Sequence, residues 1–209
     1  MKLEIENYWA GKEISEYKST QIKRHAQYVS KKRGVAQYNR VYQLTEKYFS
    51  PANNWLCLGS RNNWEKDAFS KLAGSECLTE SLDIAPASKA DYIMDINNPV
   101  PAEFLEKWDV VYTNALDHAI EAGNTLLNWM TTLKKNGVFL LHWSSYPSVS
   151  KADCCAFSYA QSIKFFEYHN IKVLYDSVAE FGDELGPKAS NKKESGLEGL
   201  GLFALSFQI

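Results

Sequence analysis

The chain has 209 residues, of which 45% are hydrophobic and 23% are charged, and its formal net charge is −2. This length and composition suit one sizeable α/β domain, and the near-neutral charge argues against a general nucleic-acid binder, which usually carries a strong basic excess. The longest apolar runs are far shorter than the roughly 20 residues that a membrane-spanning helix needs.

The cysteines and the N-terminal residues bear on the cellular compartment. Four cysteines, two of them adjacent at Cys154 and Cys155, contain no CxxC pair, and they make no disulfide framework in a chain this long. Residues 1–18 lack the apolar core and the cleavage pattern of a secretory signal. We therefore expect a cytoplasmic protein, with cysteines that mostly serve as small apolar fillers.

Residues 12–48 have helical character and a basic bias, with aromatic and aliphatic residues at mixed helical spacing. Gly34 is expected to separate two helices. One interpretation is a helical lead-in that packs on the following domain. The other is a lid or substrate-contact element, because basic and aromatic residues alternate there. We divide the chain into a helical N-terminal extension, residues 1–52, and a main domain, residues 53–209.

Strands and helices alternate from residue 53 onward. Five apolar runs predict buried strands: "NWLCLGS", "CLTESLDIAP", "DYIMDINNP", "WDVVYTNALDH" and "GVFLLHW". Cap and glycine signals predict helices over "NNWEKDAFSKLAG", with Asn62 or Asn63 as the N-cap and Gly74 at the end, and over "IEAGNTLLNWMTTLKKNG", with Gly137 at the end. Two more helical segments are "AEFLEKW" and "DCCAFSYAQSIKFFEYHN".

Two long strands, "IKVLYDSVAEF" and "GLGLFALSFQI", complete the chain with no helix between them. They should form a hairpin, and the polar segment 183–199 within it predicts a mobile loop. Alternating strands and helices imply a parallel sheet with helices on both faces. The expected fold is α/β, a doubly wound, Rossmann-like, mostly parallel seven-stranded sheet with an antiparallel last strand.

Polar residues and a glycine stand at the predicted strand ends. Ligands of open α/β sheets bind outside the carboxyl ends of the strands, where this chain has Gly59, Asp83, Asp95 and Asn114. Glycine lets the backbone approach a ligand closely. Asp83, 24 positions after Gly59, could accept hydrogen bonds from both hydroxyls of a ribose. Both aspartates also have an ordinary explanation as strand-end or turn residues.

In order and spacing, these segments resemble the class I S-adenosylmethionine-dependent methyltransferases, from about residue 53 to residue 209. The resemblance rests on "WLCLGSRNNWEKDAF", "SLDIAP", "YIMDINNP", "WDVVYTNALDH", "LKKNGVFLLHW" and the terminal strand pair. It implies S-adenosylmethionine as the cofactor. Asp83 would hold the ribose, the "MDI" residues would contact the adenine, and the fourth strand would line the methionine side. The implied cofactor-binding residues are Gly59, Ser60, Arg61, Glu65, Asp83, Ile84, Asp95, Ile96, Asn114 and Leu116.

The first loop departs from the family's usual acidic-x-Gly-x-Gly-x-Gly pattern. Cys57 replaces the acidic residue, Arg61 the second glycine and Asn63 the third. A side branch of the family has a Gly-Ser/Ala/Thr-Arg loop followed by a glutamate, and "GSR" with Glu65 resembles that branch. Arg61 has two interpretations: it pairs with a carboxylate such as Glu65, or it contacts the cofactor's carboxylate or an acidic residue that orients the loop.

Asp117 and His118 are the candidate catalytic residues, because they follow the fourth strand, where a methyl group and its acceptor should meet. Methyl transfer mainly requires positioning of the acceptor, and an oxygen acceptor must also lose a proton, which His118 could take. His118 could equally belong to the first turn of the next helix. His142 and Trp143 end the fifth strand and are candidates for acceptor binding or for a core edge. His25 and His169 are interpreted as surface or packing residues.

The leading hypothesis is a methyltransferase acting on a small-molecule or sugar-like acceptor. One alternative is a catalytically inactive binding or structural protein with the same fold, which would bind a partner through the basic N-terminal helices. A nucleic-acid methyltransferase is disfavoured, because "TNALDH" stands where "NPPY" or "DPPY" would hold a flipped base. A metal held by Asp117, His118 and His142 is conceivable, but no spacing demands it. The oligomeric state is not predicted.

Overall fold

The structure is a computed structural model that describes residues 6–27, 35–49, 51–144, 149–177, 179 and 200–207. Its main sheet comprises β2 (Asn54–Leu58), β3 (Leu78–Asp83), β4 (Tyr92–Ile93), β5 (Trp108–Thr113), β6 (Leu133–Ser144), β8 (Ile171–Asp176) and β9 (Leu200–Phe207). A small second sheet pairs β1 (Glu6–Asn7) with β7 (Cys155–Ala156). The helices are α1 (Ile14–Gln27), α2 (Val35–Phe49), α3 (Trp64–Ala73), α4 (Ala122–Met130) and α5 (Tyr159–Tyr168), with short 3-10 turns η1 (Ala102–Phe104) and η2 (Leu116–His118).

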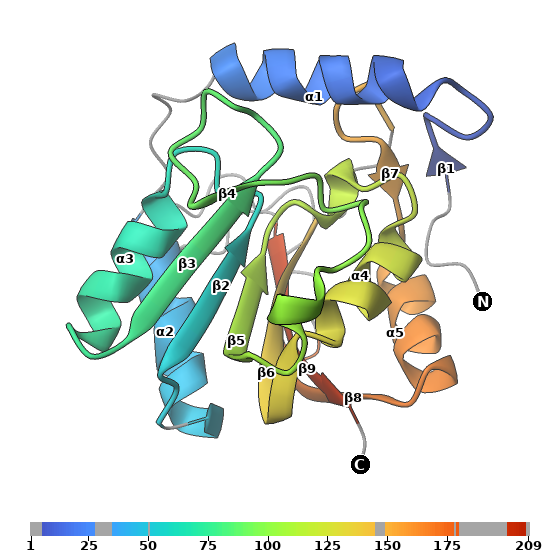
Figure 1. Ribbon diagram of the computed structural model, residues 1–209. Coiled ribbons are helices and arrows are strands. Elements are labelled where there is room, and N and C mark those ends of the chain that lie inside the picture. The colour runs from blue at the N-terminus through green and yellow to red at the C-terminus, as the bar shows by residue number, and fades with distance from the viewer. Residues whose placement is uncertain are drawn as a thin grey trace.

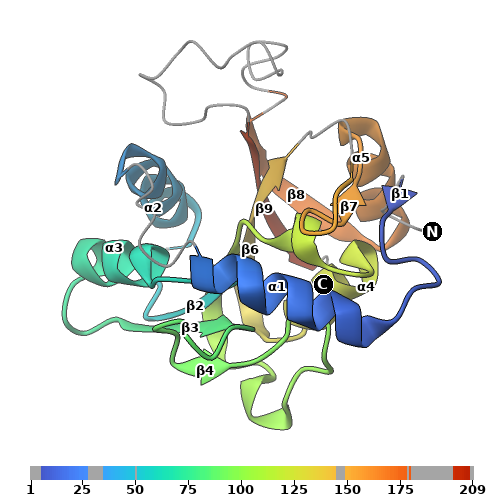
Figure 2. The ribbon, with the colours of Figure 1, turned by 90° about the horizontal axis from the view of Figure 1, so that it is seen from above.

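The strands of the main sheet run in the order β4-β3-β2-β5-β6-β9-β8. The pairings among β2 to β6 are parallel, whereas β9 is antiparallel to both β6 and β8. Helices α2 and α3 cover one face, and α4 and α5 cover the other (Figures 1 and 2). The predicted doubly wound, seven-stranded sheet with a reversed last strand is confirmed.

The central strand β2 shows why an uninterrupted apolar run forms a strand here. Its alternate side chains enter two different cores: Leu56 and Leu58 pack in the core on the α4 and α5 side, and Trp55 and Cys57 pack in the core on the α2 and α3 side. A strand that is buried on both faces needs apolar residues at successive positions. The run therefore places the turn that follows, at Gly59, at the carboxyl edge of the sheet.

The helix predicted after the fourth strand is shorter than expected. It ends at Met130, and Lys134, Lys135 and Gly137 lie in β6. The register between β5 and β6 shifts at this point, and Asn136 has a positive φ of 64°. Gly137 is needed for packing rather than for ending a helix, because a Cβ there would lie 3.0–3.1 Å from three backbone carbonyl oxygens.

The observed boundaries of other helices also differ from the predicted ones. Helix α5 begins only at Tyr159, because Ser158 caps it by accepting a hydrogen bond from the Gln161 N–H, and "AEFLEKW" forms a single 3-10 turn. Asn63 does stand at the N-cap of α3, but its side chain accepts from Ser81 Oγ instead of capping. Gly74 ends α3 as predicted. Residues 28–34, with Gly34, and the loop 183–199 lie outside the described residues.

The two N-terminal helices take different positions. Helix α2 belongs to a helical layer, and its residues Tyr38, Val41 and Leu44 join the core beneath it. Helix α1 lies across the carboxyl edge of the sheet, over the ends of β2, β3 and β5 (Figures 1 and 2). The helical character predicted for this region is confirmed over residues 14–27 and 35–49. None of the helices in the described residues is long and apolar enough to cross a membrane.

Candidate functional site

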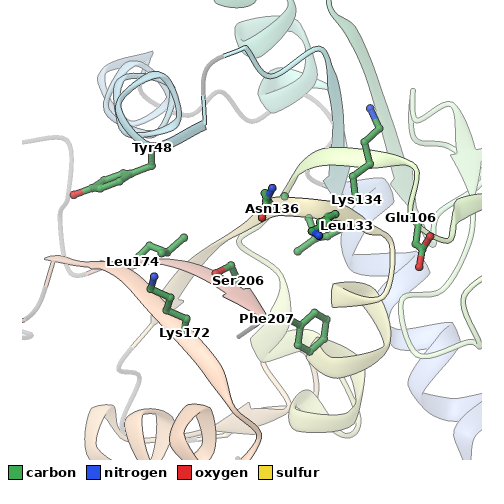
Figure 3. A pocket seen from close by; sticks show the side chains of 11 residues that line it. Tyr48, Glu106, Leu133, Lys134, Asn136, Lys172, Leu174, Ser206 and Phe207 are labelled. Atoms are coloured by element: carbon green, nitrogen blue, oxygen red, sulfur yellow. The ribbon is translucent and has the colours of Figure 1, made fainter. Parts of the chain in front are cut away.

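The broadest hollow described is an open groove at the amino ends of β5 and β6 (Figure 3). Its walls carry lysines and apolar side chains, among them Lys134, Lys172, Leu174 and Phe207. Ligands of open α/β sheets bind at the opposite edge, beyond the carboxyl ends of the strands. We therefore place the candidate site at the carboxyl edge, where a second, much smaller cavity lies.

The cavity at the carboxyl edge lies between α1 and the strand ends, and its volume is about 20 Å³. Six of its lining residues are among those predicted from the sequence. The other five come from α1, from the loop after β4 and from the loop after β5. The full set is Tyr17, Gln21, His25, Gly59, Asp83, Ile84, Met94, Asp95, Ile96, Ala115 and His118.

Gly59 makes the sharp turn after β2 that brings two loops together. Its φ is +74°, and a Cβ built on it would lie 2.5 Å from the Cβ of Ala115. The N–H groups of Gly59 and Ser60 both donate to the Leu82 carbonyl oxygen, at 2.9 and 3.0 Å. The turn therefore lies directly against the loop after β5, and no side chain fits between them.

Asp83 ends β3 with a carboxylate that has no exposed surface. Its Oδ1 accepts a hydrogen bond from the Ala85 N–H at 2.8 Å. His25 Nδ1 lies 2.9 Å from both carboxylate oxygens and, facing two acceptors, carries the proton that it donates. His25 is thus not a surface residue but a buried one, and its hydrogen bond to Asp83 was not predicted from the sequence.

The electrostatic surroundings of His25 favour its neutral form. Burial lowers its pKa from the usual 6.5, while the hydrogen bond and the charge of Asp83 oppose this change. The positive charge of Arg61 and the neighbouring His118 lower the pKa further. His25 Nε2 is buried, and it has no hydrogen-bond partner among the described residues.

Two more side chains at the cavity have an unused hydrogen-bond acceptor. Asp95 Oδ1 accepts from the N–H and the side-chain amide of Asn97, at 3.0 and 2.8 Å, but its buried Oδ2 has no partner in the described part of the chain. Gln21 donates to the Ala152 carbonyl oxygen at 2.7 Å, and its Oε1 likewise has no described partner. An unsatisfied buried acceptor costs about 1–3 kcal/mol. Such atoms suit a ligand that brings its own N–H or O–H donors.

His118 and Asp117 lie together on η2, as the sequence predicts for adjacent residues after the fourth strand. His118 Nδ1 donates to the Ala152 carbonyl oxygen at 2.7 Å. Its Nε2 lies 3.7 Å from Asp117 Oδ1 and 3.6 Å from Asp153 Oδ1. Asp153 also pairs with Arg24 at 3.0 Å, so one of the two carboxylates near Nε2 belongs to an ion pair with α1. His142 is not part of this group.

A second polar cluster lies on the α2 and α3 side, behind the first loop. The Glu65 carboxylate is buried and accepts from Ser60 Oγ at 3.1 Å, from the Tyr38 hydroxyl at 3.2 Å and from Asn114 Nδ2 at 3.3 Å. His142 Nδ1 lies 2.7 Å from the hydroxyl of Tyr112, on the same face. Three predicted cofactor residues and one predicted acceptor residue therefore gather here, outside the lining of the cavity.

The remaining predicted residues have varied surroundings. Arg61 follows the Gly59 turn, and its N–H donates to the Gly59 carbonyl oxygen at 3.0 Å. Leu116 is buried in the core on the α4 and α5 side. Trp143 lies in β6, but its side chain is outside the described residues.

The hydrogen-bond acceptors that line the cavity suit the hydroxyl and amino groups of a nucleoside such as that of S-adenosylmethionine. Asp83 offers a buried carboxylate for hydroxyl groups, and Asp95 Oδ2 offers an unused acceptor for an amino group. Ile84 and Ile96 give apolar contact area beside them. A search of the sequence alone could have included α1, because Tyr17, Gln21 and His25 recur every four residues on one helical face.

Comparisons with known proteins establish the fold. No protein-family model matches the chain, and neither does any curated protein. The chain is similar to the crystal structure of a Burkholderia thailandensis 1,6-didemethyltoxoflavin-N1-methyltransferase with bound 1,6-didemethyltoxoflavin and S-adenosylhomocysteine, with 11% identity, a TM-score of 0.60, and coverage of 93% of this chain and 87% of that one.

Two further structures show the same likeness. An S-adenosylmethionine-dependent methyltransferase from Clostridium acetobutylicum ATCC 824 has 11% identity and a TM-score of 0.54 over 83% of this chain and 92% of its own. The (4+2)-cyclase SpnF has 10% identity and a TM-score of 0.55 over 82% and 81%. The chain therefore has the fold of the class I S-adenosylmethionine-dependent methyltransferases. At these identities the likeness is one of fold, and a fold does not fix an activity.

Proposed function

We propose that the protein is an S-adenosylmethionine-dependent methyltransferase that acts on a small-molecule or sugar-like acceptor. The observation that carries the proposal is the cavity at the carboxyl edge, where the buried carboxylate of Asp83 and the unused Asp95 Oδ2 flank the Gly59 turn. Several proteins of this fold bear methyltransferase names, one of them for a small molecule, 1,6-didemethyltoxoflavin. The near-neutral charge of the chain supports such an acceptor over nucleic acid.

The proposed cofactor site divides into two ends. At the nucleoside end, Asp83 would accept from the ribose hydroxyls, and Asp95 would accept from the adenine amino group between Ile84 and Ile96. At the methionine end we place the first loop, its buried support and the residue after Ala115, namely Gly59, Ser60, Arg61, Glu65, Asn114 and Leu116. When bound, the cofactor would supply an electrophilic methyl group on a sulfonium centre.

His118 is the proposed general base. Because Nδ1 donates to the Ala152 carbonyl oxygen, the lone pair of a neutral His118 is on Nε2. An acceptor hydroxyl that loses its proton would give it to that atom. The carboxylates of Asp117 and Asp153, at 3.7 and 3.6 Å from Nε2, would stabilise the imidazolium that forms.

The acceptor side is proposed to lie beyond Asn114, where His142 pairs with Tyr112. We propose His142 and Trp143 as the residues that border it. We also propose that the protein works in the cytosol, with residues 53–209 as the methyltransferase unit and residues 1–52 as its helical extension.

The test is a calorimetric titration of the full chain with S-adenosylmethionine and S-adenosylhomocysteine. We expect saturable binding at one site, weakened at least about tenfold in Asp83→Ala, because hydrogen bonds to a charged partner are worth about 1.5–3 kcal/mol. Asp67→Ala, which removes an exposed carboxylate on α3, is the matched control and should bind as the wild type does. Equal affinity in Asp83→Ala would refute the assignment of the ribose to Asp83.

A second candidate is a catalytically inactive binding protein with this fold. Two observations favour it: Cys57 and Arg61 replace the acidic residue and a glycine of the first loop, and α1 closes the cavity. Binding of S-adenosylhomocysteine without methyl transfer to any member of a broad acceptor screen would support it over the enzyme. Methylated product from the screen, lost in His118→Ala, would support the methyltransferase.

A further inference from the structure

Helix α1 presents a polar face to the strand ends. Its buried residues, Tyr17, Gln21 and His25, recur at i, i+4 and i+8. Helices usually dock through an apolar stripe, but this face is held by hydrogen bonds. The Tyr17 hydroxyl donates to the His118 carbonyl oxygen at 3.0 Å, Gln21 donates to the Ala152 carbonyl oxygen at 2.7 Å, and His25 donates to Asp83. Tyr17 also packs with Trp9 and Cys154, so the polar part of the face is at Gln21 and His25.

His25 and the Ala85 N–H together occupy most of the hydrogen-bonding capacity of Asp83. A carboxylate has about four acceptor positions. Oδ1 already accepts from the Ala85 N–H and from His25, and Oδ2 also accepts from His25. One further donor could be accommodated, whereas a vicinal diol brings two. A diol that binds Asp83 through both hydroxyls must therefore displace His25.

The size of the cavity leads to the same conclusion. Its volume of about 20 Å³ is roughly the room that one water molecule needs, and ligand pockets are typically about 300–1,000 Å³. A nucleoside therefore cannot enter while α1 holds this position. Yet Gln21 Oε1, His25 Nε2 and Asp95 Oδ2, all on residues that line the cavity, are buried without a described partner. These atoms would be satisfied by a polar ligand under a raised helix.

We infer that α1 is a lid over the nucleoside end of the site, and that His25 holds it closed by occupying the place of a vicinal diol on Asp83. This inference rests on the proposed function. Binding then requires an exchange, in which the ligand's hydroxyls replace the imidazole on the carboxylate. The apparent affinity is reduced by the fraction of molecules in which the lid is closed.

The test is a calorimetric titration of the full chain with S-adenosylhomocysteine. We expect His25→Ala to bind about tenfold more tightly than the wild type, because the loss of a charge-assisted hydrogen bond raises the open fraction. His25→Asn can still donate to Asp83 and should stay near the wild type. Lys23→Ala, an exposed change on the same helix, is the control. The 2′-deoxy analogue needs the same raised helix, so His25→Ala should increase its affinity by about the same factor.

Tyr17→Phe provides an independent variant, because it removes the hydroxyl that donates to the His118 carbonyl oxygen and leaves Asp83 untouched. It too should bind more tightly, by a few-fold. If the wild type binds and both His25→Ala and Tyr17→Phe bind equally well or more weakly, while their thermal unfolding shows folded protein, the lid is refuted and the methyltransferase proposal stands. If no variant binds S-adenosylmethionine or S-adenosylhomocysteine at millimolar ligand, both proposals fail.

Discussion

Substituting Gly59 by alanine tests the geometry of the turn at the candidate site. The new Cβ would meet two separate obstacles, a φ of +74° and a contact of 2.5 Å with the Cβ of Ala115. The left-handed backbone costs a non-glycine residue about 1–2 kcal/mol, and overpacking in a tight environment costs about 1–3 kcal/mol. We therefore expect Gly59→Ala to lower the free energy of unfolding by about 2–5 kcal/mol, measured by urea denaturation.

Gly11 supplies a matched control, because its φ is +72° and nothing lies within 4 Å of a Cβ built on it. Gly11→Ala should show the backbone cost alone. The clash itself can be isolated by adding Ala115→Gly, which should recover much of the difference between the two alanine variants. If Gly59→Ala and Gly11→Ala cost the same free energy of unfolding, the close approach of the two loops is wrong.

Three further outcomes are expected. The pKa of His25 is lower in the folded protein than its unfolded value of about 6.5, so the unfolded state binds more protons at pH values between the two. Any stability advantage of the wild type over His25→Ala should therefore shrink as pH falls from about 7.5 to 5.5 in urea titrations. An advantage that grows on acidification would contradict this. Glu65→Gln should lower the free energy of unfolding by about 1–3 kcal/mol, because its amide N–H groups would face donors, whereas the exposed Asp67→Asn should change it little. Gly137→Ala should lower it by about 1–3 kcal/mol through crowding of backbone carbonyls, and near-neutral stability would refute that crowding.

The sheet could be predicted because each of its central strands contains a run of consecutive apolar residues. The run ending at Leu58 and the run ending at Thr113 are buried on both faces over most of their length, so apolar residues occupy consecutive positions in each. The end of α4 could not be predicted in the same way. The segment "KKNG" is compatible with both the end of a helix and an irregular start of a strand. The packing of Gly137 against the backbone of β5 favours the strand.

The candidate site was predictable where it depends on strand ends. Gly59, Asp83 and Asp95 follow three neighbouring strands, and parallel topology brings them to one edge. His25 was missed because its partner lies 58 positions away and its role depends on where α1 docks. His142 ends the fifth predicted strand and lies in β6. Strand alternation turns it to the α2 and α3 face with Tyr112, a direction that a one-residue shift would reverse.

The irregular first loop has a physical explanation in the packing behind it. Cys57 is fully buried in the core on the α2 and α3 side, and burial together with the nearby charge of Glu65 raises the pKa of its thiol. A carboxylate at position 57 itself would enter an apolar core. Glu65 instead brings a carboxylate from the first turn of α3 to the same region, where Ser60 and Asn114 donate to it. The loop therefore has a buried acidic group behind it, supplied by the helix rather than by the strand, and the replacement at Cys57 does not count against a binding role for Gly59.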